Sequence, residues 1–243
     1  MRAAVETNFR TFNEPFEGWL PHMYLDREGY VTTGMGNNVD PISLALGLPW
    51  KNADGSAASQ AEITSEWQLV KSRTDLEPHG GGAYGAITQL RLTSDDVTTL
   101  VGQKLAQIER DMRGMFPGWD GFPADAQMGI LSMAWAMGDG EFTAAKWPKF
   151  TAAANAGDWD TAAAESQMAP TPGIVARNAA NELLFHNAAT PGIDPETLYY
   201  PNTPATMTTM PTSTGAIVGT VCAVLVLLGV AGWGFYKLHK GAA

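Results

Sequence analysis

The chain has 243 residues, which suits one medium-sized domain with additional segments, and its 45% hydrophobic content is sufficient for a sizeable core. The net charge of −10 argues against a nucleic-acid partner, because polyanions are bound by basic surfaces. The single cysteine, Cys222, excludes an internal disulfide, and the four histidines show no metal-ligand spacing, so we expect neither a metal site nor a cofactor.

The N-terminal segment is expected to be helical. Residues 1–12 carry apolar side chains at helical spacing and lack the apolar stretch of a cleavable signal peptide. Asn13 then predicts the N-cap of a new helix, with Pro15 in its first turn. Two carboxylates that could act as an acid, Glu14 and Glu17, follow Asn13.

Two carboxylates and a hydroxyl then occur in a compact pattern. Eight residues separate Glu17 from Asp26, and five separate Asp26 from Thr32. Residues 27–29, which end in Gly29, predict a turn. The β-branched and aromatic residues 30–33 then predict a returning strand. A hairpin of this kind carries Asp26 and Thr32 on neighbouring backbone segments.

This residue pattern has two interpretations. Acidic residues beside turns are usually solvated and without a chemical role. Two carboxylates around a cleft also suit the hydrolysis of a glycosidic bond, because one donates a proton to the leaving oxygen while the other directs water or stabilises the developing cation.

Residues 37–93 combine loops with one clear helix. Ser59 and Glu62 form a capping-box pattern that opens a helix extending to about Arg73. The glycine run at residues 80–82 predicts a flexible linker. It does not indicate a phosphate-binding loop, because no Lys-Ser/Thr pair follows it.

The second half predicts a helical region. Residues 94–115 form a long amphipathic helix with acidic residues at its start. Residues 123–137 begin with proline, end before Gly138 and are apolar nearly all round, which indicates a buried helix. Further helices are expected at residues 147–156, 158–168 and 174–188.

The residues around the carboxylates carry a family resemblance. Glu17, Asp26 and Thr32 match the E-x8-D-x5-T motif without gaps, and several neighbours also match: Gly18, Tyr24, Gly29, Gly34 and Gly36. This segment resembles the active-site segment of the phage-type lysozymes, glycoside hydrolase family 24, which are muramidases that cut bacterial peptidoglycan. The helices at 94–188 are similar to the remainder of that family, so the resemblance covers roughly residues 13–188.

The resemblance implies a fold and a set of roles. The fold is α+β and predominantly helical, a lysozyme-like two-lobed fold with a β-hairpin lobe and a helical lobe. Glu17 is implied as the general acid, and Asp26 with Thr32 as the group that holds the attacking water. Arg177 is implied to face Glu17 and orient it, although an ordinary surface arginine on a helix remains an alternative. The chain departs from the family at Asn37, where the family usually has histidine, and at Asn181, where it commonly has glutamate.

The implied activity is cleavage of the bond between N-acetylmuramic acid and N-acetylglucosamine, by a phage-encoded or prophage-derived enzyme acting during lysis or entry. Two alternatives remain open. A lytic transglycosylase of the same superfamily works with a single catalytic glutamate. A membrane-anchored structural or wall-binding virion protein would keep the fold without the activity.

The C-terminal region predicts a membrane anchor. Residues 190–214 are rich in Pro and Thr and predict a linker, which places the boundary of a catalytic domain at residues 1–189. Residues 215–236 carry no charge, are long enough to cross a bilayer, and precede a short basic tail at 237–243. Gly215 and Gly219 form a single GxxxG that would allow weak self-association.

The basic tail also predicts a topology. The positive-inside rule places it in the cytoplasm, or on the equivalent face of a virion membrane, with residues 1–189 on the peptidoglycan-facing side. The opposite orientation remains open, because no signal peptide is expected. The expected localisation is a single-pass protein of the host inner membrane or of a virion membrane.

Overall fold

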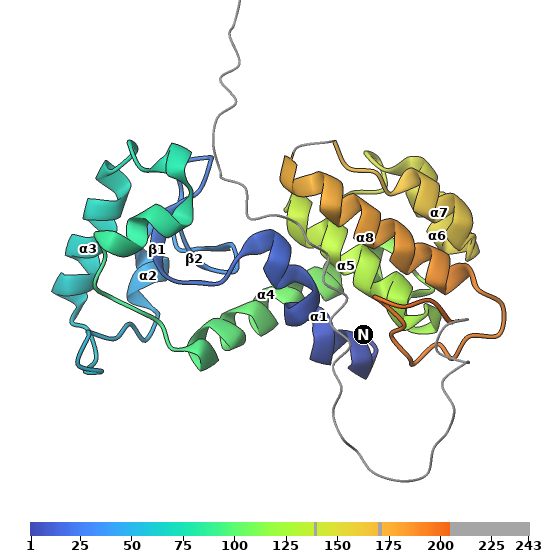
Figure 1. Cartoon of the computed structure of the whole chain (residues 1–243), viewed down its shortest axis with the longest axis horizontal. Coiled ribbons are helices and arrows are strands. Elements are labelled where there is room, and N and C mark those ends of the chain that lie inside the picture. The colour runs from blue at the N-terminus through green and yellow to red at the C-terminus, as the bar shows by residue number, and fades with distance from the viewer. Residues whose placement is uncertain (139, 170–171, 205–243) are drawn as a thin grey trace, which may run out of the picture. The chain divides into compact units, whose positions relative to one another are not determined.

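The computed structural model describes residues 1–138, 140–169 and 172–204, and these form a mostly helical α+β fold with a small antiparallel sheet (Figure 1). The coarse fold class is therefore confirmed. The predicted span at 215–236, its GxxxG pair, the tail at 237–243 and the linker residues 205–214 lie outside the described residues. Across the described ranges, no helix combines the length and apolarity needed to cross a membrane.

The described chain divides into two compact units. The first unit consists of Met1–Pro21, Gly34–Asn37 and the described chain from Leu92 to Pro204, and it contains most of the helices. The second unit consists of His22–Thr33 and Asn38–Arg91. Glu17 and Arg177 belong to the first unit, and Asp26 and Thr32 belong to the second.

Helix α1 (Ala3–Glu17) differs from the prediction, because it runs unbroken through the expected boundary at Asn13. Asn13 is fully buried, and its side-chain amide donates to the Phe9 carbonyl at 3.0 Å, so it does not act as an N-cap. Pro15 lies inside the last turn and has no N–H to donate to the carbonyl one turn earlier, so the helix continues to Glu17 despite one missing hydrogen bond. The helix ends at Gly18, whose φ of 76° suits a residue without a Cβ.

The sheet has the strand order β1-β2-β3, with β1 at Leu20–Leu25, β2 at Val31–Gly34 and β3 at Asn37–Asn38. The predicted hairpin is therefore present, with its returning strand shifted by one residue. The turn between β1 and β2 contains Gly29 at a φ of 79°. The Asp26 amide donates to the Tyr30 carbonyl at 3.0 Å, which closes the hairpin.

The helices of the second unit are short. Helix α3 (Gln60–Ser72) starts with the predicted capping box between Ser59 and Glu62, and it packs against α2 (Ile42–Leu46). The glycine run is not a flexible break: it lies between and within two 3₁₀ helices, η1 (Glu77–His79) and η2 (Gly81–Ala86). His22 contributes to this order, because its Nε2 lies 3.0 Å from the Gly81 carbonyl oxygen.

The predicted helices of the first unit are present. Helix α4 spans Ser94–Met115, a 3₁₀ turn η3 follows at Trp119–Gly121, and α5 spans Ala124–Met137. Three further helices complete the unit: α6 (Pro148–Ala156), α7 (Trp159–Glu165) and α8 (Pro172–Ala189). Thr93 caps α4 in a capping box with Asp96.

Helix α5 is the centre of the first unit. It is buried along nearly its whole length and packs against α1, α4 and α8, while α6 and α7 lie beside α8 (Figure 1). Phe185 of α8 stacks on Trp159 and meets Phe150 edge-on, with centroid distances of 6.4 and 5.3 Å. A Cβ at Gly129 would lie only 2.7 Å from the Phe185 ring, so the two helices approach closely because this residue is glycine.

The described part of the predicted linker is packed against the first unit. Buried Asp125 accepts hydrogen bonds from the amides of Tyr199 and Tyr200, at 2.8 and 3.1 Å. The Tyr200 ring lies edge-on to Phe12 with centroids 4.9 Å apart. The ordered first unit therefore continues beyond α8, through residues 190–204.

Candidate functional site

Glu17 occupies the C-terminal end of α1. Its side chain is 21% exposed, and Oε1 accepts a hydrogen bond from Nη2 of Arg177 in an ion pair. Gly18 ends the helix at this point, which leaves the carboxyl group at the helix terminus and within reach of solvent. One oxygen is therefore committed to Arg177 while part of the side chain remains accessible.

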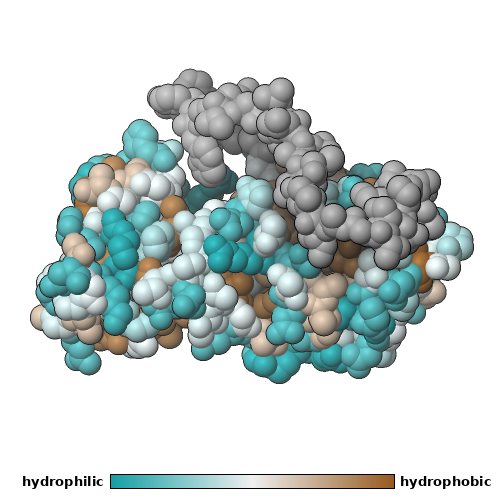
Figure 2. Space-filling view, turned by 60° about the horizontal axis from the view of Figure 1, so that its bottom comes forward, coloured by the Kyte–Doolittle hydropathy of each residue, from teal (hydrophilic) through white to brown (hydrophobic). Residues whose placement is uncertain are grey.

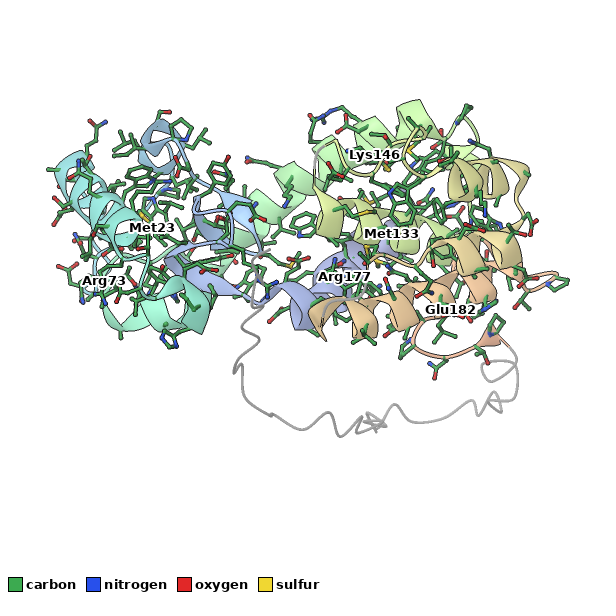
Figure 3. All side chains as sticks on the ribbon, turned by 90° about the horizontal axis from the view of Figure 1, so that it is seen from above. Met23, Arg73, Met133, Lys146, Arg177 and Glu182 are labelled. Atoms are coloured by element: carbon green, nitrogen blue, oxygen red, sulfur yellow. The ribbon has the colours of Figure 1, made fainter. Side chains whose placement is uncertain are left out.

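Arg177 lies on α8 and is 2% exposed, so it is not a surface residue. Its Nη1 donates to the Ser132 carbonyl of α5 at 3.0 Å, and its guanidinium lies 4.9 Å from the Phe16 ring centroid. Burial lowers the pKa of Arg177, whereas the charge of Glu17 acts in the opposite direction. Figure 3 shows Arg177 among the packed side chains of the first unit.

The surroundings of this pair contain buried polar atoms without a hydrogen-bond partner among the described residues. They include Nε of Arg177 and both amide atoms of Asn181, one turn farther along α8. Oδ1 of Asn13, one turn before Glu17 on α1, is likewise buried without a hydrogen-bond partner among the described residues. Four such atoms lie on the two helices that carry Glu17 and Arg177, and the others given for the described residues lie on α5 and α6.

Asp26 and Thr32 meet in the second unit. The Thr32 hydroxyl donates to Oδ2 of Asp26 at 3.0 Å, and Thr32 is almost fully buried. Oδ1 accepts from the amides of Glu28 and Tyr30, at 3.1 and 2.8 Å. The Asp26 carboxylate therefore holds the turn of the hairpin and fixes its own orientation, which a residue that directs a water molecule requires.

A hollow of about 410 Å³ opens in the first unit, between the end of α5 and the start of α8. Met137 at the end of α5, Trp147, Met168 and Ile174 of α8 contribute to its wall. Ile174 precedes Arg177 by one turn on α8, so this helix contributes one residue to the hollow and one to the ion pair. The wall also contains the charged residues Glu141 and Lys146, and its partly exposed tryptophan suits the apolar face of a sugar ring.

Sequence reasoning did not identify Ser132 or Phe16 as neighbours of the site. Ser132 acts through its backbone carbonyl, which has no side-chain signature, and Phe16 is an ordinary apolar residue in the sequence. Over the ranges that the structure describes, no group of His, Cys, Asp and Glu side chains is arranged to hold a metal ion. Comparison with protein-family models and with curated proteins finds no match for the chain.

Proposed function

We propose that this protein is a muramidase of the phage-lysozyme type that hydrolyses the glycan strands of peptidoglycan. The observation that carries the proposal is the ion pair between Glu17 and the buried Arg177. Burying a guanidinium is costly unless it is paired, and this one is directed at the carboxylate that the E-x8-D-x5-T motif assigns as the acid. The hydrogen bond between Thr32 and Asp26 provides independent support from the second half of the motif.

The proposed reaction breaks the bond between the anomeric carbon of N-acetylmuramic acid and the bridging oxygen. Glu17 donates a proton to that oxygen, which leaves as the 4-hydroxyl of N-acetylglucosamine. Asp26 and Thr32 hold the water that adds to the anomeric carbon from the opposite face. Asp26 accepts the proton that this water loses, and the configuration is inverted.

The finer architecture belongs to the same proposal. The second unit, with the hairpin, corresponds to the β-hairpin lobe of a lysozyme-like fold, and the first unit corresponds to its helical lobe. Residues 215–236 anchor the protein in the bilayer with residues 1–189 on the peptidoglycan-facing side. This tether supplies the local concentration at the wall that an acidic protein does not obtain by charge attraction. Figure 2 shows hydrophilic residues spread over the face that it draws.

The test of the acid is Glu17→Gln, compared with Glu14→Gln. Glu14 lies in the same last turn of α1 and pairs with Arg10 at the surface, so it is a matched control. We expect Glu17→Gln to lower the hydrolysis of purified peptidoglycan by at least ~10²-fold, the scale of a lost general acid. Glu14→Gln should retain the wild-type rate, and circular dichroism should show both variants folded. A folded Glu17→Gln protein with a near-normal rate would contradict the assignment.

The identity of the products separates the alternatives. New reducing ends on muramic acid support hydrolysis, whereas 1,6-anhydro ends would replace the proposal with a lytic transglycosylase. Folded wild-type protein that releases neither product would favour the wall-binding role. Protease added to intact spheroplasts tests the topology: degradation of residues 1–189 is expected, and protection until the membrane is opened would reverse the orientation.

A further inference from the structure

Lys104 occupies an unusual environment for a lysine. It lies in the middle of α4, where its ammonium is 4.1 Å from the centroid of the buried Trp135 ring and donates to the Gly36 carbonyl at 3.0 Å. Lysine normally keeps its ammonium in water. Here the ammonium lies over an aromatic ring and donates a hydrogen bond to the backbone, and these two contacts hold the side chain in one position. Lys149 of the same unit shows the contrast, since its side chain is 77% exposed.

The carbonyl that Lys104 holds belongs to a turn beside Glu17. Gly36 has a φ of 75°, and a Cβ placed on it would lie 3.7 Å from Oε2 of Glu17 and 4.0 Å from Nζ of Lys104. The carboxylate and the ammonium are therefore both within about 4 Å of one point. This oxygen of Glu17 is the one that the hydrogen bond from Arg177 leaves free, since Arg177 binds Oε1.

Helix α4 contacts this turn at a second place. Gly34 lies so close to Val97 that an added Cβ would be 3.0 Å from the Val97 Cγ1 atom. Val97 and Lys104 are two turns apart on α4, so they contact the start and the end of the short segment 34–36. Within the turn, the Met35 amide donates to Oδ1 of Asn37 at 3.3 Å.

We propose that Lys104 is a positioning residue for Glu17, which holds the Gly34–Asn37 turn against the free oxygen of the carboxylate through its bond to the Gly36 carbonyl. The inference rests on the proposed function only for its effect on the reaction rate. The hydrogen bond by which Lys104 holds the turn does not depend on the proposed function. Lys104 acts through the turn, and Glu17 remains the group that transfers the proton.

The experiment compares Lys104→Met, Lys104→Arg and the surface control Lys149→Met. Methionine keeps the apolar stem but removes the donor and the charge, whereas arginine keeps both. Hydrogen exchange of a peptide covering residues 31–39 reports the turn directly. We expect Lys104→Met to raise its exchange rate by roughly tenfold or more, the effect of removing one stabilising contact from a local structure. Lys104→Arg and Lys149→Met should leave it unchanged.

Steady-state kinetics supplies the second readout. We expect Lys104→Met to lower kcat by roughly 10- to 100-fold with KM nearly constant, because a small displacement of a reacting group slows the chemical step strongly. Lys104→Arg should restore most of kcat. Unchanged exchange, or faster exchange with an unchanged kcat, would overturn the proposal, as would a failure of arginine to rescue either readout. If Lys104→Met does not fold, Lys104→Gln takes its place: its shorter, uncharged side chain should also raise the exchange rate and lower kcat, and unchanged values would overturn the proposal. If the wild type has no muramidase activity, the proposed function fails and the exchange rates alone decide whether Lys104 holds the turn.

Discussion

Removing the Arg177 guanidinium tests the arrangement around Glu17 most directly. Arg177→Met keeps an unbranched side chain of similar length but removes the partner of Glu17 and the donor to the Ser132 carbonyl. Taking one partner from a buried ion pair costs roughly 3–5 kcal/mol. Because Glu17 is 21% exposed and water reaches it, we expect a loss of about 2–3 kcal/mol in the free energy of unfolding at neutral pH.

The assay is a double-mutant cycle with Arg177→Met, Glu17→Gln and the double variant, measured by urea denaturation. We expect a coupling energy of at least about 1 kcal/mol, because the two groups are in contact. The exposed pair Lys149 and Glu165, whose charged atoms are 3.5 Å apart, serves as the control cycle and should give about 0–0.5 kcal/mol. A loss below about 0.5 kcal/mol for Arg177→Met, or a cycle additive within that range, would refute the reasoning.

Four further substitutions give separate readouts. Gly129→Ala should destabilise the protein by about 1–3 kcal/mol in thermal unfolding, because the new methyl group meets the Phe185 ring. Gly102→Ala, which has open space in α4, should stabilise it by about 0.5–1 kcal/mol, and equal effects would contradict the packing argument. Burial raises the pKa of Asp125, so stability from this group is present below the ordinary value of 3.8 and is lost as the pH rises through the raised value. The stability of wild type relative to Asp125→Asn should therefore fall as the pH rises above 3.8, and a rise would contradict the sign. Trp147→Ala should raise KM for glycan fragments several-fold at constant kcat, and an unchanged KM would exclude the hollow as a sugar site.

Elements specified by local chemistry were predictable from the sequence. The capping box of Ser59 and Glu62 satisfies backbone donors within one turn, and its helix begins where expected. The helix at 123–137 was recognisable because its residues are apolar on every side, and the structure buries nearly all of it. The turn at Gly29 was likewise predicted by a residue that tolerates positive φ.

Elements decided by tertiary packing were not predictable. Asn13 has the side chain of an N-cap, yet burial within α1 directs its amide to the carbonyl one turn earlier. The partner of Glu17 lies 160 positions away, so no local spacing identifies Arg177 as that partner. The family resemblance suggested the pairing, while the residues alone left a surface arginine equally acceptable.

Residues 190–204 show where an argument from composition reaches its limit. Their lack of periodicity correctly excludes a helix that packs through one face, but it does not say where the backbone hydrogen bonds go. The Tyr199 and Tyr200 amides find the buried Asp125 carboxylate, and the amide of Ala124 donates to the Pro195 carbonyl at 2.9 Å. Such a segment is ordered by its contacts with buried residues, the Asp125 carboxylate among them, which no property of the segment itself reveals.

This order limits the proposed tether. With residues 190–204 packed on the first unit, only residues 205–214 separate it from the proposed span, and a fully extended chain of that length reaches roughly 35 Å. The whole range 190–214 would have reached more than twice as far. Inserting a Gly/Ser segment after residue 204 should therefore extend the zone of wall cleavage in membrane-reconstituted protein, measured on peptidoglycan held at fixed heights above a supported bilayer. The same reach with and without the insertion would show that the packed segment does not set the tether length.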